Sequence, residues 1–502
     1  MSEKSPLSRK ISKKIDNNQN NLLTSKSSGL MICPMEEKMK KTLVLAAAIS
    51  AVALLASCSK GGKSNLSSDS SVVGYFTFDE DIKDDEIVDH SKAKTNAALD
   101  ALDGFQMTEG VSGKALVLDG TQYISLEDHV LSGEGLTMAA WVKVGAWKTW
   151  QRVFDIGGGD GTKDVFLAVD GRMAGTFCAY EQSSAVTCNA PLTPIKKWTH
   201  LAMTIGNGKM ALYVNGALAE EKDMAVSIAD IAEGATGIFV GRSNWVADPL
   251  LEGAIDEVVV AKRAFTAEEI AGIYAKNAQS GGAVADVSNA QPFVINSSSN
   301  CTAYYSFDDE DGAKDISGSG NSSKVNSTEY TEGKFGKAIV LNGAEQFIDL
   351  NQAIFTGNGF TFSAWVKVNT MPDWSRIFDM GDAGGNDWWL GKEGGSGKLR
   401  LDVNNPSGNV SVIGPVIEDG VWTHVAVTVG DEVASMYVNG KLVMNNGSKA
   451  LPTDLLNGLK GAYIGRSNWP DPYISAAFDD VFFASRLYTE AEIASLYKGI
   501  SK

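Results

Sequence analysis

The feature that most constrains this chain is an internal repeat, because almost everything between residues 72 and 499 is written twice. The pentapeptide GRSNW occurs at residues 241–245 and again at residues 465–469, an offset of 224. Longer pairs keep the same offset, such as WQRVFDIG with WSRIFDMG and WTHLAMTIG with WTHVAVTVG. A repeat of this length indicates a duplicated domain and excludes a short-period solenoid.

Each copy of the repeat predicts β-structure. Short runs such as TMAAWVKV and HLAMTIG are rich in β-branched and aromatic residues, and turns of Gly, Asn and Asp separate them. The Asn-Gly pair in each YVNG is typical of a tight hairpin. The pattern predicts an all-β fold of two antiparallel β-sandwiches. Each sandwich closes with a short helix at residues 266–274 and 489–497, where a Thr cap is followed by Glu in the first turn.

Composition sets the domain boundaries around the two copies. The first sandwich is expected at residues 72–277 and the second at residues 301–499. Residues 278–300 are small, polar and without a hydrophobic period, which predicts an interdomain linker. Residues 58–71 have a similar composition and are expected to form a flexible tether.

The N-terminal part carries a targeting signal. Residues 42–56 are apolar and follow a cluster of lysines; the run is short for a bilayer span but suits a secretory signal. It ends in Leu-Ala-Ser-Cys, which resembles the lipobox of bacterial lipoproteins. The resemblance implies a signal peptide at residues 35–57, a lipid on Cys58 and a place in the cell envelope.

Two further expectations concern the ends of this signal. Residues 1–34 are polar and are expected to be a spurious extension from a misplaced start codon, or disordered, because Met35 or Met39 would begin a signal of normal length. Ser59, directly after the lipidated cysteine, favours the outer membrane by analogy with lipoprotein sorting. The side of the membrane that the domains face is left open.

Charge and cysteine content bound the partners and the redox context. The net charge of −17 disfavours nucleic acid as a partner. Cys178 and Cys188 are placed symmetrically about a polar turn, so two paired strands would bring them opposite each other. In an exported protein this predicts a disulfide rather than two free thiols. Cys301 is left without a partner and without a predicted role.

Each copy resembles the laminin-G-like, concanavalin A-like lectin/glucanase domain of exported bacterial proteins. The resemblance rests on an ordered set of elements: YFTFDE or YYSFDD, GKALVLDG, AWVKV, WTH with YVNG, and the closing GRSNW and D-[ED]-V. It implies a jelly-roll sandwich that binds carbohydrate or protein. The hydrolases that share this sandwich resemble one another in an E-x-D-x-x-E strand, and this chain has none, so no enzyme is expected.

The four histidines give little support to catalysis. His200 and His424 repeat within WTH, and the simplest interpretation is that both are buried in the sandwich rather than ligands. There is also no G-x-S-x-G elbow for a nucleophile.

A structural Ca²⁺ is the one cofactor that we expect. Calcium prefers carboxylate and carbonyl oxygens, and domains of this family commonly carry it. Each copy has an acidic opening, a second acidic loop and a closing Asp that adjacent first and last strands would bring together. The alternative is surface charge paired with Arg263 or Arg486. The candidate ligands are Asp79, Asp89 and Asp256 in the first copy and Asp308, Asp315 and Asp479 in the second.

The GRSNW stretch is expected to combine structure with ligand binding. Its arginines, Arg242 and Arg466, are expected to pair with Asp155 and Asp379 of the duplicated R-x-F-D element. Its Asn and Trp then lie in a loop, where a flat indole beside an amide suits a sugar ring. The candidate ligand-binding residues are Arg242, Asn244, Trp245 and Trp150 in the first copy, and Arg466, Asn468, Trp469, Trp374, Trp388 and Trp389 in the second.

The sequence therefore predicts a lipid-anchored protein that binds glycan without cleaving it, through two sandwiches. The first alternative is an adhesin or assembly protein that binds a protein at the cell surface, and the second is a glycoside hydrolase. A sugar site needs exposed aromatic side chains, whereas a protein partner needs a wider apolar patch.

Overall fold

The structure is a computed structural model. It describes residues 66–80, 82–101, 104–159, 163–170, 175–181, 186–278, 287–405, 408–456 and 458–501. The predicted signal peptide, Cys58 and the extension at residues 1–34 lie outside these ranges. None of the helices within them has the length and apolar character needed to span a bilayer.

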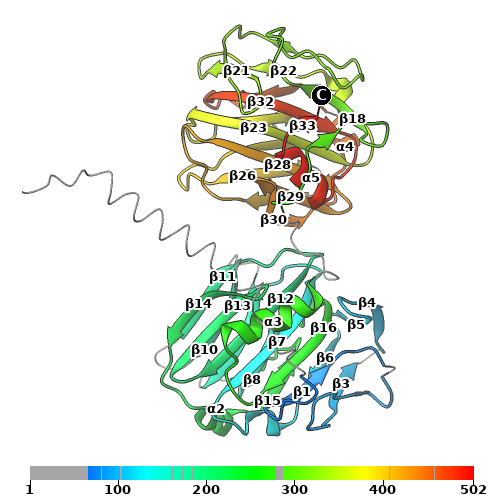
Figure 1. The fold of residues 1–502 in the computed structure, drawn as a ribbon, viewed down its shortest axis with the longest axis vertical. Helices are drawn as coiled ribbons and strands as arrows, with labels where there is room; N and C mark the ends of the chain where they lie inside the picture. Colours follow the sequence, from blue (N-terminus) through cyan, green and yellow to red (C-terminus); the bar gives the residue numbers. More distant parts are fainter. Residues whose placement is uncertain are drawn as a thin grey trace, which may run out of the picture. The chain divides into compact units, whose positions relative to one another are not determined.

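The first copy of the repeat is a sandwich of two antiparallel sheets (Figure 1). One, which we call the helix-covered sheet, has the strand order β14 (Ala217–Asp223), β13 (Lys209–Val214), β12 (Trp198–Gly206), β7 (Leu136–Val144), β16 (Glu252–Ala261), β5 (Lys114–Asp119) and β4 (Gln106–Glu109), with β1 (Val72–Phe76) also on β16. The other, which we call the site sheet, has the order β11 (Val186–Pro191), β10 (Gly175–Glu181), β9 (Asp164–Asp170), β8 (Gln151–Gly157), β15 (Gly237–Val240), β6 (Gln122–Ser125), β3 (Ala97–Ala101) and β2 (Glu86–Ile87).

The second copy repeats this arrangement. Its helix-covered sheet has the order β20 (Tyr330–Glu332), β21 (Lys337–Asn342), β32 (Ser475–Ala484), β23 (Phe360–Thr370), β28 (Trp422–Gly430), β29 (Val433–Val438) and β30 (Lys441–Gly447), with β18 (Cys301–Tyr305) also on β32. Its site sheet has the order β19 (Lys324–Val325), β22 (Ile348–Asp349), β31 (Gly461–Ile464), β24 (Arg376–Gly381), β25 (Asp387–Lys392), β26 (Leu399–Asn405) and β27 (Gly408–Ile413).

Strand alternation decides which side chains enter the core between the sheets. In β8, Phe154 and Ile156 are fully buried in the first core, so Asp155 between them belongs to the outer face. In β24, Phe378 and Met380 fill the second core and leave Asp379 on the outer face in the same way. The outer face of each site sheet is therefore where a polar ligand can meet side chains held by the strands.

The closing helices lie where the sequence predicts them. The first, α3 (Ala267–Asn277), begins at a Thr266 capping box and packs Ile270 and Ile273 on the outer face of its sheet. Figure 1 shows it lying across β12, β7 and β16. The second, α5 (Glu490–Tyr497), begins at a Thr489 capping box and packs in the same way. The remaining short helices are η1 (Asp128–Leu131), α2 (Ile228–Gly234), η2 (Gln352–Ile354) and α4 (Pro452–Leu456).

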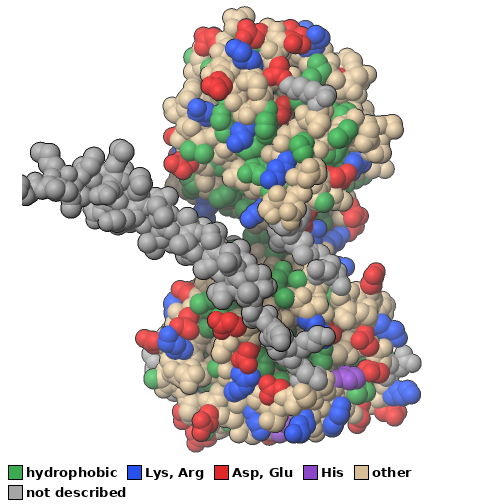
Figure 2. Space-filling model, viewed as in Figure 1, with side chains coloured by type: hydrophobic (Ala, Val, Ile, Leu, Met, Phe, Trp, Pro, Cys, Tyr) green, Lys and Arg blue, Asp and Glu red, His purple; other side chains and the backbone are tan. Residues whose placement is uncertain are grey.

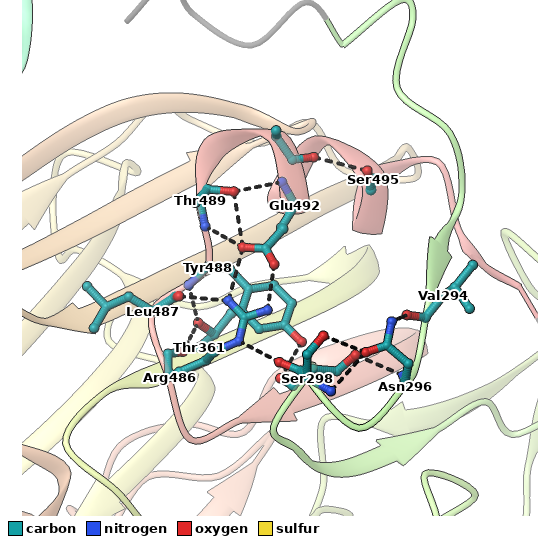
Figure 3. Close-up of polar contacts among 12 residues, drawn as sticks. Val294, Asn296, Ser298, Thr361, Arg486, Leu487, Tyr488, Thr489, Glu492 and Ser495 are labelled. Carbon is teal, nitrogen blue, oxygen red and sulfur yellow. Dashed lines mark hydrogen bonds and ion pairs between the residues drawn. The ribbon is translucent and has the colours of Figure 1, made fainter.

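Part of the predicted linker belongs to the second sandwich. The short strand β17 (Phe293–Val294) pairs in parallel with β33 (Ile500–Ser501), and Tyr488 donates its hydroxyl hydrogen bond to the carbonyl of Ser299 at 2.8 Å. Arg486 binds the carbonyl of Ser298 at 3.2 Å, as Figure 3 shows. The second domain therefore starts before the predicted residue 301.

Candidate functional site

The duplicated R-x-F-D element forms a buried polar centre on the outer face of each site sheet. In the second copy the Asp379 carboxylate accepts hydrogen bonds from Asn468 at 2.7 Å, Ser467 at 2.9 Å and the Nε atom of Arg376 at 3.2 Å. Asp379 is fully buried. A carboxylate without solvent needs such partners, because burying an unpaired charge is costly.

The first copy builds the same centre from equivalent residues. Asp155 accepts hydrogen bonds from Asn244 at 2.6 Å and from Arg152 at 3.1 Å. Burial raises the pKa of Asp155 to about 6, although the hydrogen bond from Asn244 and the charge of Arg152 both oppose that rise. The Asn of GRSNW therefore holds the fold together in both copies.

The predicted pairing of the GRSNW arginines with these aspartates is wrong. Arg152, three residues before Asp155 on β8, takes the place that was expected for Arg242. Residues three apart on a regular strand face opposite sides, but a bulge between Arg152 and Phe154 turns Arg152 to the same face. The second copy has the same bulge, and there Arg376 rather than Arg466 binds Asp379.

Three tryptophans of the second copy surround this centre. Trp469 and Trp374 are 46% and 41% exposed. Trp389 is buried beneath the guanidinium of Arg376, whose carbon lies 3.9 Å from the ring centroid. Trp374 meets the edge of Trp389 with a centroid separation of 6.2 Å. Two exposed indoles thus lie next to buried side chains, Trp374 against Trp389 and Arg376, and Trp469 against Asp387.

Trp388 is not part of this surface. It alternates with Trp389 on β25 and is packed in the core of the second sandwich, with its ring 6.0 Å from that of Phe360. The NDWWLG stretch was expected to give two ligand-binding tryptophans. Because adjacent residues of a strand face opposite sides, only one of the pair can face outward.

The equivalent tryptophans of the first copy are less exposed to a ligand. Trp150 and Trp245 are half-buried and pack against a cluster formed by Phe166 and Phe177. The ring centroids of Trp245 and Phe166 are 6.2 Å apart, as are those of Trp150 and Phe177. In this copy the aromatic side chains therefore cover one another.

The exposure of the tryptophans differs between the copies because the sequence of one strand of the site sheet has diverged, β10 in the first copy and β26 in the second. In the first copy Phe177 and Ala179 face outward on β10. The second copy has Arg400 and Asp402 at the equivalent places on β26, joined by two bonds of 2.7 and 3.0 Å. These residues belong to no duplicated motif, so no repeated pattern in the sequence marks them as site residues.

Trp374 and its counterpart Trp150 share an unusual backbone. Both have a positive φ, 65° and 61°. Bulky side chains rarely adopt this conformation, and when they do it is maintained by the surrounding structure, often at functional sites. In the second copy the amide of Trp374 donates to the carbonyl of Lys392 at 3.1 Å, which fixes the turn.

Trp469 is tied to a second buried acid. Its indole Nε1 donates to Asp387 at 3.2 Å. Burial and the nearby charge of Asp379 raise the pKa of Asp387 to about 8. A proton on Asp387 at neutral pH relieves the repulsion between the two acids.

The predicted calcium ligands converge only in part. Asp79 and Asp256 bind the same turn of the first copy, where they accept the amides of Lys114 at 2.9 Å and Val111 at 2.8 Å. Asp308 and Asp479 bind the equivalent turn of the second copy.

The third acid of each predicted set is engaged elsewhere. Asp89 and Asp315 accept several amides of their own loops, including Ser91 at 2.7 Å and Ser317 at 2.9 Å. Within the described ranges no three His, Cys, Asp or Glu side chains form a group able to hold a metal. The proposed three-acid set thus does not assemble, and Arg263 and Arg486 pair instead with Glu269 and Glu492.

The repeated histidines lie in the interior, as expected. His200 and His424 are buried beside Trp141 and Trp365, with centroid separations of 5.5 and 5.4 Å. Burial lowers the pKa of both imidazoles to about 3. They are therefore neutral at physiological pH and inaccessible to a ligand.

The two cysteines of the first copy lie directly opposite each other. Cys178 on β10 and Cys188 on β11 are register partners, and both side chains are buried. The structure carries them as thiols. The hairpin is thus confirmed, and the disulfide stays a prediction.

Two antiparallel sandwiches, each with a closing helix on one sheet, define a tandem jelly-roll protein. The family model of the concanavalin A-like lectin/glucanases superfamily matches residues 118–271 and 342–494, together more than half of the chain. The chain belongs to this family. No curated protein matches it significantly.

Solved structures of carbohydrate-binding domains are similar to parts of the chain. Domain 4 of an extracellular arabinanase from Geobacillus stearothermophilus, in complex with arabinotriose, is 24% identical over 39% of this chain and 98% of its own, with a TM-score of 0.33. A sialidase CBM40 from Ruminococcus gnavus, bound to sialyllactose, is 14% identical over 34% and 99%, with a TM-score of 0.29. The binding domain of botulinum neurotoxin DC is 10% identical over 82% and 94%, with a TM-score of 0.33. None of these scores reaches 0.5, so family membership rests on the family model.

Proposed function

We propose that this protein is a non-catalytic envelope lipoprotein that binds carbohydrate on the site sheet of its second sandwich. The observation that carries the proposal is the pair of exposed indoles, Trp374 and Trp469. Both are hydrogen-bonded to residues of the polar centre: the Trp374 carbonyl accepts from Arg376, and the Trp469 indole donates to Asp387. Sugar rings present apolar faces and polar edges, so they bind where aromatic faces and hydrogen-bonding groups lie together.

The second copy supports this function better than the first. Its Arg400, Asp402 and Ser411 form a hydrogen-bonded row, whereas the first copy has Phe177 and Ala179 in the corresponding region. Aromatic rings that pack against one another leave less exposed ring surface and fewer hydrogen-bonding groups for a sugar. The first sandwich is therefore the weaker binder in this proposal.

Membership of the family does not decide between binding and catalysis, and the proposal against catalysis rests on burial. Asp379 and Asp387, the two acids of the polar centre, are at most 2% exposed. The exposed Asp373 beside Trp374 is paired with Lys392. A glycosidase needs two carboxyl groups that reach opposite sides of one bond. Release of reducing sugar from a polysaccharide panel would overturn this part of the proposal.

A glycan array with the full-length protein tests the proposal directly. We expect binding that is lost in Trp469→Ala and Trp374→Ala and retained in Trp245→Ala, with the melting temperature of each variant as the measure of folding. An array without a hit from the folded protein would contradict the proposal and favour a protein partner at the cell surface. Lipidation of Cys58 is tested separately, by mass spectrometry of the membrane-extracted protein.

A further inference from the structure

The arginines of GRSNW differ from every other arginine that the structure describes. The others each form an ion pair with a carboxylate: Arg152, Arg263, Arg376, Arg400 and Arg486. Arg242 and Arg466 form neither an ion pair nor a hydrogen bond to any described residue; each instead lies over aromatic rings. Each copy of the repeat therefore has an arginine whose N–H donors bind no residue in the part of the chain that the structure describes.

Aromatic rings hold both guanidinium groups in place. The carbon of the Arg466 guanidinium lies 4.5 Å from the ring centroid of Tyr463 and 4.8 Å from that of Phe347. The corresponding distances for Arg242 are 4.5 Å to Phe239 and 4.6 Å to Tyr123. Stacking occupies the flat face of a guanidinium and leaves the N–H donors along its edge available.

Arg486 shows what an arginine with a structural function looks like in this protein. It also lies over a ring, 4.1 Å from the centroid of Tyr488. Figure 3 shows its donors bound to Glu492 and to the carbonyls of Ser298 and Leu487. Stacking alone thus does not account for the unused donors of Arg466.

Arg466 belongs to the same outer face as the proposed sugar site. Its ring partner Tyr463 is the register partner of Asp379, so both side chains are on one side of the sheet. The other cations beside the tryptophans are already neutralised: Arg376 by Asp379 and Asp471, Arg400 by Asp402 and Glu393, and Lys392 by Asp373. Among the described arginines on this face, Arg466 is therefore the one that remains for a ligand.

We propose that Arg466, and Arg242 in the first copy, recognise the carboxylate of an acidic sugar. This inference rests on the proposed function and names its ligand class. The planar fork of a guanidinium matches the two oxygens of a carboxylate. A single carboxylate also suits a chain with a net charge of −17 better than a densely sulfated or phosphorylated polymer, which the protein would repel.

Titration calorimetry with paired ligands tests the inference. Trigalacturonic acid and sialyllactose represent the two common sources of a sugar carboxylate, and the carboxyl-reduced form of each supplies a neutral partner. We expect the full-length protein to bind at least one acid roughly ten- to a hundredfold more tightly than its reduced form, as a charge-assisted hydrogen-bond pair allows. The acid that binds identifies the source.

Substitutions locate the effect. Arg466→Gln combined with Arg242→Gln should remove the preference for the acid and leave binding of the reduced form unchanged. Arg466→Lys should keep part of the preference, since it retains the charge but loses the fork. Arg486→Gln is the matched control, because it removes a stacked arginine elsewhere in the sandwich and should leave the preference intact.

Three outcomes overturn the inference. Equal affinity of the wild-type protein for an acid and its reduced form does so while leaving glycan binding in place. A preference that survives in the Arg466→Gln, Arg242→Gln protein also does so. If neither these sugars nor any array glycan binds the folded protein, the proposed function fails together with the inference.

Discussion

Asn468 donates the hydrogen bond from its Nδ2 atom to Asp379 at 2.7 Å, and it also binds the carbonyl of Gly461 at 3.1 Å. Asn244 makes the same two bonds, to Asp155 at 2.6 Å and to Gly237 at 3.2 Å. The amide therefore ties the loop after the strand to a buried acid on the neighbouring strand. In GRSNW, it is the Asn that the fold uses and the Arg that it leaves available.

We expect Asn468→Ala to destabilise the second sandwich. The change leaves a fully buried oxygen of Asp379 without its closest donor, and such a loss costs about 1–3 kcal/mol. Urea unfolding measures the difference in the free energy of unfolding. Trp469→Ala is the control, because that side chain is 46% exposed and its removal should cost less. If Asn468→Ala leaves stability unchanged and abolishes sugar binding, Asn468 is a ligand contact instead.

Removal of Arg376 should destabilise the second sandwich much more than removal of Arg466. Arg376 is 3% exposed and pairs with Asp379 and Asp471, so Arg376→Met breaks a buried ion pair at a cost of about 3–5 kcal/mol. Arg466→Met removes only contacts with rings and should cost about 1 kcal/mol or less. If both variants lose the same free energy of unfolding, Arg466 stabilises the fold through contacts other than hydrogen bonds.

The architecture could be predicted from the sequence because the same pattern of strands, turns and helix caps occurs in both copies. Strand periodicity, the Asn-Gly turns and the Thr-capped helices all recur at the same offset, and the two sandwiches, α3 and α5 follow from them. The register of Cys178 with Cys188 also followed from symmetry about a polar turn.

Side-chain pairing within the site was not predictable in the same way. A bulge decides that Arg376 and not Arg466 meets Asp379, and no residue in the R-x-F-D element signals that bulge. Trp388 and Trp389 are chemically identical, so only the phase of β25 tells which of them faces the core. Arg400 was missed because it lies where the two copies have diverged.

Acidity of the buried aspartates makes stability depend on pH. Burial raises the pKa of Asp256 and Asp479 to about 7, above the value in the unfolded chain. The folded state then binds more protons, so this contribution to stability is lost as the pH rises toward and through 7. We expect the melting temperature to fall between pH 6.5 and 8, measured by differential scanning calorimetry at constant ionic strength.

This window separates the aspartates from the buried histidines. Burial lowers the pKa of His200 and His424 to about 3. These histidines therefore reduce the stability of the protein only as the pH falls below about 6.5, their pKa in the unfolded state. Asp256→Asn together with Asp479→Asn should reduce the fall in melting temperature above pH 6.5, where the histidines do not contribute, and should also remove the contribution of these two acids between about pH 4 and 6.5. The part of the response above pH 6.5 that comes from Asp387, whose pKa is raised to about 8, should remain. A melting temperature that rises from pH 6.5 to 8 would show that both acids are ionised in the folded protein.

Oxidation should join Cys178 to Cys188. The two are register partners on β10 and β11 and are buried together, so a bond between them needs little rearrangement. Protein isolated from an oxidising compartment should resist alkylation at both sites until it is reduced and unfolded, as peptide mass spectrometry would show. Cys301, in the second copy, is the control and should react after unfolding without reduction. Alkylation of Cys178 without prior reduction would exclude the disulfide.

Addition of Ca²⁺ tests whether the turns bound by Asp256 and Asp479 also hold a metal ion. Asp256 and Asp479 each hold a turn through backbone amides that bind Oδ2, while the buried Oδ1 of Asp479 has no hydrogen-bond partner among the described residues. A Ca²⁺ ion there would need further oxygens besides that one. Ca²⁺ would also hold the acids ionised, so its stabilising effect should grow with pH. The measurement is the melting temperature at pH 8 in Ca²⁺ and in EDTA. If Ca²⁺ raises the melting temperature of the wild-type protein but not that of Asp479→Asn, an ion binds in the second copy. If the curves in Ca²⁺ and EDTA are identical, the acids only hydrogen-bond the amides of the turn.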